Sequence, residues 1–273
     1  MPLERRIAKR RTRRGVPLFV GVLAAAATAF FVLPLVGLLT RADWGTIWQD
    51  LTSQVALDSL RLSLECSLWS TVLSLVLGVP LAWVLARSDL PGRALLRALV
   101  LLPMVLPPVV GGVALLFAFG RSNGLLGPWL YHTFGIQLTF TPAGVVMAET
   151  FVAMPFLVIT VEGGLRAIDS RYEDAAATLG AGPLTTFRRV TYAFLRPSLF
   201  AGTALAWARA LGEFGATITF AGNITGRTQT TPLAVYLLLE SDPPAAIALS
   251  LVLLGVSLVV LVSLRDRWFG LRR

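Results

Sequence analysis

The sequence predicts an all-α integral membrane protein with six transmembrane helices. Three observations support this fold class: long apolar runs without charge, a mean hydropathy of +0.73, and a charged fraction of only 14% in 273 residues. Each apolar run is long enough to cross about 30 Å of hydrocarbon as a helix. The alternating segments of about ten residues that are typical of membrane β-barrels are not seen, so the spans are expected to be helical.

The six expected spans form one membrane domain, residues 16–264, between a basic N-terminal segment (1–15) and a C-terminal tail (265–273). In chain order the spans are 15–40, 66–86, 98–120, 141–161, 198–221 and 243–264. The first, third and sixth contain no charged residue. The fourth contains Glu149, which is expected to face the bundle interior and not an anion path, and the fifth contains Arg209 and Glu213. The outside loops between them are too short to form a receptor domain.

The basic residues lie almost entirely on one side of these spans. With the N-terminus inside, 19 of the 24 Lys and Arg residues fall in inside segments, and only Arg41, Arg121 and Arg227 fall in outside loops. By the positive-inside rule, both termini are cytoplasmic. The net charge of +9 therefore needs no nucleic acid to explain it, and the N-terminal segment is expected to lie on anionic membrane lipid.

Several other classes of protein are disfavoured by the motifs. The first apolar run continues to Leu39, far beyond the roughly 7 to 15 residues of a signal-peptide core, so an uncleaved span is expected. The one cysteine, Cys66, excludes an internal disulfide, and because it lies within a predicted span it is expected to be a packing residue. The chain has a single histidine, His132, and no phosphate-binding loop, H-E-x-x-H or G-x-S-x-G motif. We therefore expect no catalytic site, no bound metal and no ATP hydrolysis by this chain alone.

Prolines in the third span predict a bent helix. Pro103, Pro107 and Pro108 lie within seven residues, and each removes a backbone donor from the helix. Neighbouring helices and water can satisfy the freed carbonyl groups, which suits a helix that lines a path. A purely structural kink fits the same pattern equally well.

The longest inside loop, residues 164–197, is expected to fold into a compact shape. A helix is predicted from Ser170, with two acids in its early turns and a stop at Gly180 and Gly182. A second short helix is predicted from Pro183 to Val190, and it presents Phe187 beside basic residues. Such a shape would fit a groove on a soluble protein, although an ordinary solvated loop is the alternative.

This loop resembles the EAA motif of ABC-importer permeases, E-A-A-x-x-x-G. Asp174, Ala175, Ala176 and Gly180 match the spacing, with Asp in place of the first Glu and Glu173 just before it. Val190 fills a later isoleucine position, whereas Tyr192 and Ala193 depart from the family's Leu-Pro. The stretches "LARSDLPGR", "LPMVLPPVVGG" and "ARALGEFGATITFAGN" extend the resemblance over essentially the whole chain, and the last of these is similar to molybdate permeases.

The resemblance implies a six-helix type I importer permease in a bacterial cell membrane. It would work as a homodimer with two cytoplasmic ATPases and an extracytoplasmic molybdate-binding protein, and ATP and Mg would be used by the ATPase rather than bound by this chain. The short helix after Gly180 would dock in the ATPase and couple hydrolysis to transport. The implied coupling residues are Glu173, Asp174, Ala175, Ala176, Gly180, Gly182, Thr185, Phe187 and Arg188.

Two charges four residues apart on the fifth span form the second candidate site. An ionisable group at that depth costs at least about 2.5 kcal/mol unless it is paired. Arg209 and Glu213 are expected either to neutralise each other or to let Arg209 contact an oxyanion, with structural pairing favoured. Small residues after Glu213 suit close approach of two copies. The candidate path or gate residues are Arg209, Glu213, Gly215, Thr217 and Asn223.

Three rival functions stay open at this point. A sulfate, thiosulfate or tungstate permease would share the architecture, because a separate receptor sets most of the selectivity. A secondary transporter is a rival of another class, but the docking loop and the absence of paired broken-helix repeats disfavour it. An intramembrane enzyme would need a nucleophile and base that the sequence does not supply. The hypothesis carried forward is a molybdate permease.

Overall fold

The computed structural model describes residues 17–268, with side chains described to residue 263. No strand occurs in this range, so the described chain is helical, as predicted. The described residues divide into two compact units, with the boundary between Ala42 and Asp43. The predicted basic segment 1–15 lies outside the described residues. Of the predicted tail, residues 265–268 belong to the last helix, and the rest is likewise outside.

The first unit contains one helix, α1 (Leu18–Arg41), with Pro34 inside it. Its composition is apolar, and none of its residues is buried within its own unit. Its 24 residues are enough to cross a bilayer. The first predicted span is thus present as a helix of the expected length.

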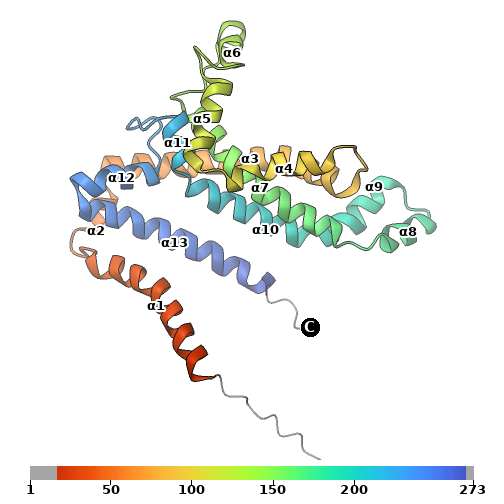
Figure 1. Ribbon diagram of the computed structural model, residues 1–273, viewed down its shortest axis with the longest axis horizontal. Helices are drawn as coiled ribbons and strands as arrows, with labels where there is room; N and C mark the ends of the chain where they lie inside the picture. Colours follow the sequence, from red (N-terminus) through yellow and green to blue (C-terminus); the bar gives the residue numbers. More distant parts are fainter. Residues whose placement is uncertain (1–16, 269–273) are drawn as a thin grey trace, which may run out of the picture. The chain divides into compact units, whose positions relative to one another are not determined.

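The second unit contains all other elements (Figure 1). Its helices are α2 (Ile47–Leu51), α3 (Gln54–Arg87), α4 (Arg93–Val105), α5 (Pro108–Phe119), α6 (Gly127–Phe134), α7 (Pro142–Arg166), α8 (Arg171–Thr178), α9 (Pro183–Thr186), α10 (Tyr192–Leu211), α11 (Gly215–Phe220), α12 (Thr231–Ser241) and α13 (Pro243–Trp268), with a π-helix, η1 (Phe187–Thr191), between α9 and α10.

Helices α3, α7 and α10 pack together and contain the main core. Leucine, valine and alanine side chains fill it, with Leu85, Leu157 and Val161 fully buried. The helices approach closely where side chains are small: a Cβ on Gly78 of α3 would lie 3.1 Å from Leu157 Cδ2. Side-chain caps define two helix starts, because Ser53 Oγ accepts a hydrogen bond from Ala56 N–H, and Thr141 Oγ1 accepts one from Gly144 N–H.

A row of buried serines on α3 provides polar contacts inside this bundle. Ser63 Oγ accepts a hydrogen bond from the Thr231 N–H at 2.6 Å, and Ser67 Oγ accepts one from Trp207 Nε1 at 3.0 Å. Cys66 lies beside them, buried among Val145 and Ala221, so its predicted packing role is confirmed. The small side chains of Ser63 and Ser67 thus permit close helix contact while they pair one backbone N–H and one indole N–H.

Four described helices are long and apolar enough to cross a membrane: α1, α3, α7 and residues 243–263 of α13. The pair α4 and α5 counts as a fifth only if the two are taken as one span, and they are bent by 119°. The bend predicted from the prolines is confirmed: α4 ends at Val105, and α5 restarts at Pro108, in its first turn.

The prediction of one continuous helix over residues 198–221 is wrong. The helix starts earlier, at Tyr192, ends at Leu211, and resumes as α11 only at Gly215. The chain is irregular at Gly212, Glu213 and Phe214. Glycine weakens a helix interior, and the Glu213 carboxylate satisfies a backbone N–H of the next helix, so the interruption is stabilised locally.

Candidate functional site

The segment 171–191, made of α8, α9 and η1, contains the residues selected by the EAA resemblance. It lies at one end of α7 and α10, and α11 and α12 lie at the other end (Figure 1). The helix start predicted at Ser170 is confirmed. Glu173 and Asp174 occupy the first turn of α8, where acids interact favourably with the helix dipole.

α8 ends in a Schellman motif at Gly180. The Gly180 N–H donates to Ala177 O at 2.9 Å, and the Ala181 N–H donates to Ala176 O at 3.0 Å. Gly180 has φ of +81°, which glycine adopts much more easily than other residues. Gly182, by contrast, has φ of −70° and simply precedes α9. Only the first of the two predicted helix-stopping glycines is therefore required by its backbone.

The predicted short helix 183–190 does not end at Val190. α9 runs directly into η1, and η1 runs into α10, so the chain is helical without interruption from Pro183 to Leu211. No glycine or proline lies between Thr186 and Tyr192 to stop it. The part of the segment from Pro183 onward is consequently continuous with α10 through a single π-helical stretch, whereas α8 is joined to it by the turn at Gly180.

Two contacts fix this segment to the end of α3. Arg87 Nη1 and Nη2 donate to the two carboxylate oxygens of Glu173 at 3.1 and 3.2 Å, and Thr191 Oγ1 donates to the same carboxylate at 2.7 Å. The Phe187 ring meets the Trp83 ring edge to face, with centroids 5.6 Å apart. Glu173 and Phe187 therefore hold the segment in place.

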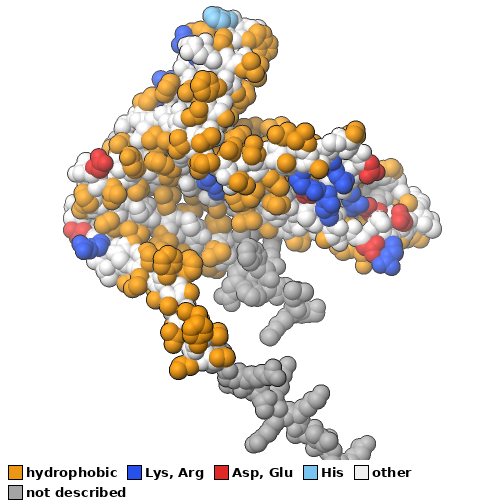
Figure 2. Space-filling view, in the orientation of Figure 1, with side chains coloured by type: hydrophobic (Ala, Val, Ile, Leu, Met, Phe, Trp, Pro, Cys, Tyr) orange, Lys and Arg blue, Asp and Glu red, His pale blue; other side chains and the backbone are white. Residues whose placement is uncertain are grey.

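The remaining predicted coupling residues lie on the outer side of the segment, except for the half-buried Ala176. Leu179, Leu184 and Arg188 are exposed, and neither Asp174 nor Ala175 is covered. Leu184, Thr185, Arg188 and Arg189 line a hollow of about 370 Å³. Figure 2 shows basic and acidic side chains gathered at this end, beside the largely hydrophobic surface of the bundle. Exposed leucine, hydroxyl and guanidinium groups together suit contact with another protein.

The entry to α8 carries an exposed ion pair. Arg171 Nη2 and Nε donate to Asp169 Oδ2 at 2.5 and 2.8 Å, and the Arg171 backbone N–H donates to Asp169 Oδ1 at 3.0 Å. These hydrogen bonds from the guanidinium and then the backbone lower the pKa of Asp169 below its ordinary value. Asp169 is thus a carboxylate acceptor under neutral conditions.

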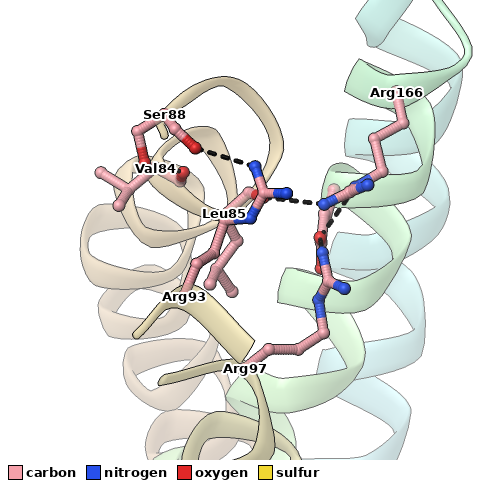
Figure 3. A network of polar contacts seen from close by, with 7 residues as sticks. Val84, Leu85, Ser88, Arg93, Arg97 and Arg166 are labelled. Atoms are coloured by element: carbon pink, nitrogen blue, oxygen red, sulfur yellow. Dashed lines mark hydrogen bonds and ion pairs between the residues drawn. The ribbon is translucent and has the colours of Figure 1, made fainter. Parts of the chain in front are cut away.

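A second polar network, the α4–α7 junction, adjoins the segment (Figure 3). Glu162 of α7 is paired with Arg97 of α4 and with Arg166 one turn along α7. Arg166 Nη2 also donates to the Leu85 carbonyl of α3 at 3.0 Å. Glu162 is only 6% exposed, whereas Arg97 and Arg166 are 35% and 41% exposed. One buried carboxylate thus holds two cations that still reach the surface.

Sequence reasoning did not identify this junction. Glu162 and Arg166 are four residues apart at a helix end, a spacing that places them on one face, and that pattern could have singled them out. The third member, Arg97, lies 65 residues away from Glu162, and no local spacing relates the two. Only the packing of α4 beside α7 brings them together.

Arg209 and Glu213 do form the predicted ion pair, with Arg209 Nη2 at 2.6 Å from Glu213 Oε2. The Glu213 side chain is 1% exposed and that of Arg209 is 28% exposed. Glu213 Oε1 also accepts a hydrogen bond from the Ala216 N–H at 2.9 Å, at the start of α11. The carboxylate therefore joins α10 to α11 across the break, which is a structural role.

The other candidate path residues occupy different environments. Gly215 packs on α5, where a Cβ would lie 2.8 Å from Pro108 Cβ, and Ala216 is fully buried. Gly215 and Ala216 thus serve contact between α11 and α5 of one chain, and the close approach of two copies stays a prediction. Thr217 is fully buried, and its hydroxyl has no partner among the described residues. Asn223 is half-buried.

Glu149 of α7 is a further buried acid, 1% exposed, and its Oε2 has no hydrogen-bond partner among residues 17–263. Its predicted interior position is confirmed. Within the same described range, no group of three or more His, Cys, Asp or Glu side chains is arranged to hold a metal ion. The polar chemistry of the site is therefore that of paired charges and exposed docking groups.

Comparisons with known proteins support the family resemblance found in the sequence. The family model described as "Binding-protein-dependent transport system inner membrane component" matches residues 74–270. The molybdenum transport system permease protein ModB of Mycobacterium bovis is 49% identical over 254 residues, covering 92% of this chain and 95% of that protein. The sulfate transport system permease protein CysT of Salmonella typhimurium is 38% identical over 262 residues, covering 94% of each.

Solved structures give the same fold at much lower sequence identity. A bacterial ABC transporter involved in the import of the acidic polysaccharide alginate has a chain that superposes with a TM-score of 0.73. The alignment covers 94% of this chain and 96% of that one, at 16% identity. At this identity the likeness concerns the fold alone.

Proposed function

The chain belongs to the family of binding-protein-dependent transport system inner membrane components, and from this premise we propose that it is the permease of an ATP-driven molybdate importer. The observation that carries the proposal is the 49% identity to a molybdenum permease over nearly the full length of both chains. Sulfate is the second candidate, because a sulfate permease is similar over the same length at 38% identity.

The proposed assembly is a homodimer with two cytoplasmic ATPases and one extracytoplasmic receptor. Each copy crosses the bacterial cell membrane six times, with α10 and the bent α4–α5 pair added to the four long apolar helices. Both termini are then cytoplasmic, as the distribution of basic residues favours. ATP and Mg are bound by the ATPase subunits, and the permease itself performs no bond-breaking step.

In this assembly the segment 171–191 is the coupling segment. Its exposed face, with Leu184, Thr185 and Arg188, docks in a cleft of the ATPase. The opposite face is fixed to α3 by Glu173 and Phe187, and the segment continues without interruption into α10. Movement of the ATPase is therefore passed to α10 as a rigid-body displacement.

The ion pair of Arg209 and Glu213 is proposed to be structural rather than a binding site for the anion. Glu213 uses both of its oxygens within the chain, one toward Arg209 and one toward the Ala216 N–H. A paired guanidinium attracts an oxyanion less than a free one. The pair therefore stabilises the α10–α11 break, near which the path residues Thr217 and Asn223 lie.

The proposed function is tested by uptake into vesicles that contain the chain, its ATPase and its receptor. Labelled molybdate should accumulate only when ATP is present on the side of the membrane where the ATPase lies. Unlabelled molybdate should compete with this uptake better than sulfate does. Tungstate should compete at similar concentrations because its charge and shape are the same. If sulfate competed more strongly than molybdate, the proposed substrate would change from molybdate to sulfate. Uptake without ATP would exclude an ABC importer.

The orientation makes a separate prediction that needs no partner protein. In a Cys66→Ala background, a cysteine at Thr185 should react with an impermeant thiol reagent only from the cytoplasmic side. A cysteine at Thr225 should react only from the opposite side, because both positions are exposed and lie on opposite sides of the proposed spans. Labelling of both from the same side would contradict the six-span topology.

A further inference from the structure

α4 is held to the bundle by few contacts. None of its residues is buried, and only Leu96 and Val100 pack, half-buried, on the core cluster of α3 and α7. Leu95 and Leu99 are exposed to the surroundings. The apolar contact of α4 is consequently small, and the ion pair from Arg97 to the buried Glu162 is its main polar attachment to α7.

This attachment lies close to the anchor of the coupling segment. Arg166, the second partner of Glu162, donates to the Leu85 carbonyl, two residues before the Arg87 that holds Glu173. Arg93 of α4 donates to the Ser88 carbonyl at 2.8 Å, on the same α3 end (Figure 3). The ends of α3 and α7, the start of α4 and the coupling segment thus meet at one place.

The other end of α4 leads to the candidate path. After the 119° bend, α5 packs tightly on α11: a Cβ on Gly112 would lie 2.7 Å from Thr219 Cβ and 2.8 Å from the Ala216 carbonyl. Such contacts leave little freedom for α5 and α11 to slide past each other. A displacement of α4 that is passed through the two-residue bend to α5 would therefore move α11, which begins directly after the break at Glu213.

We propose that Arg97 and Glu162 form a joint that transmits movement of the coupling segment through α4 to the α5–α11 pair. Arg97 is a positioning residue: it does not contact the ATPase face or the path, and it acts by keeping α4 attached to α7. This inference rests on the proposed function. When the joint is intact, α4 and α5 move with the coupling segment, as α10 does. When the joint is broken, only α10 moves with the coupling segment.

The three variants that test the joint are Arg97→Met, Arg166→Met and Arg97→Lys. The first two each remove one cation from Glu162 and leave the other, so the change in charge at the carboxylate is matched. Only Arg97→Met separates α4 from α7. Arg97→Lys restores the cation on α4 as the conservative variant. Both positions, Arg97 and Arg166, reach the surface, so each of the three variants is expected to fold.

The first measurement is molybdate transported per ATP hydrolysed by the complete complex in vesicles. Arg97→Met should lower this ratio about tenfold while hydrolysis continues, a size typical of coupling between sites. Arg166→Met should stay within about twofold of the parent, and Arg97→Lys should recover most of the loss. A ratio that is unchanged in Arg97→Met, or equally lowered in Arg166→Met, would overturn the joint.

The second measurement needs no transport. Amide hydrogen exchange of α4 in the full-length permease in lipid should rise about tenfold in Arg97→Met and stay near the parent in Arg166→Met. Equal exchange in the two variants would refute the attachment of α4 through Arg97. If the parent complex takes up no oxyanion at all, the proposed function fails by itself, and the exchange comparison still decides whether the joint exists.

Discussion

The carboxylates of Glu162 and Glu213 are both almost completely buried, yet they are held in different ways. Glu162 has two arginine partners, on α4 and α7, at the end of the bundle. Glu213 has one arginine partner and one backbone N–H, at the interruption between α10 and α11. Loss of one arginine therefore leaves Glu162 paired but leaves Glu213 without a cation. Burial alone does not make an ion pair critical; the number of partners decides it.

The largest expected effect tests this difference directly. Arg209→Met should lower the free energy of unfolding in detergent by about 3 kcal/mol, because it leaves a buried carboxylate unpaired. The matched variant Arg166→Met should lower it by only about 1 kcal/mol, because Arg97 still neutralises Glu162 and the further loss is the hydrogen bond to the Leu85 carbonyl. Equal losses in the two variants would remove the distinction between the sites.

The double variant Arg209→Met with Glu213→Gln separates structure from transport at the same site. The amide oxygen of Gln can still accept the Ala216 N–H, so much of the lost stability should return. Recovered stability with recovered uptake supports a structural pair. Recovered stability without uptake would assign Arg209 to the gate or to the anion.

A somewhat smaller effect is expected at Gly180, where the constraint is the backbone conformation rather than a buried charge. Gly180→Val should cost about 1–2 kcal/mol locally, because a β-branched residue is strained at φ of +81°. No heavy atom lies within 4 Å of a Cβ at Gly180 or Gly182, so Gly182→Ala is a control for added side-chain volume. Coupled uptake should fall in the first variant only, with membrane insertion unchanged in both. Full receptor-stimulated hydrolysis in Gly180→Val would contradict its role.

Two adjacent acids extend the comparison to the coupling segment. Glu173→Ala removes the contacts to Arg87 and Thr191, and it should loosen α8 by about 1 kcal/mol in amide exchange. Asp174→Ala should change the stability of α8 little, because the higher helix propensity of Ala offsets the lost interaction with the helix dipole. It should weaken association with the ATPase, because Asp174 is exposed on the docking face. The reverse pattern would exchange the anchoring and docking roles of the two residues.

The smallest effect is expected at the exposed pair of Asp169 and Arg171. The folded-state pKa of Asp169 is lowered, so the carboxylate's contribution is present above its unfolded pKa and disappears as pH falls through the folded pKa. The stability difference between the parent and Asp169→Asn should therefore be small and constant from about pH 8 to 5; it should begin to fall only near pH 4 and vanish once the pH is below the lowered folded-state pKa. A difference that changes near pH 7 would contradict this assignment.

Much of the chain's identity was determined by the sequence alone. The long apolar runs predict helices that can span a membrane, since burying unpaired backbone groups in hydrocarbon is too costly for other structures. The resemblance carried by Asp174, Ala175, Ala176 and Gly180 is confirmed by the family match. Cys66 and Glu149 were correctly placed in the interior. Each lies within an apolar run, and such a run can be recognised from neighbouring residues in the sequence alone.

Contacts between distant residues and the places where helices break were decided by the tertiary structure. Glu162 meets Arg97, and Glu173 meets Arg87, only because α4 and α8 pack beside α7 and α3; the partners are 65 and 86 residues apart in the chain. The interruption at Gly212–Phe214 is stabilised by a side chain that caps the following helix, and the helix predicted to stop at Val190 continues because its continuation as α10 packs on the bundle. Helix propensity amounts to a few tenths of a kcal/mol per residue, so packing and buried ion pairs outweigh it wherever the two disagree.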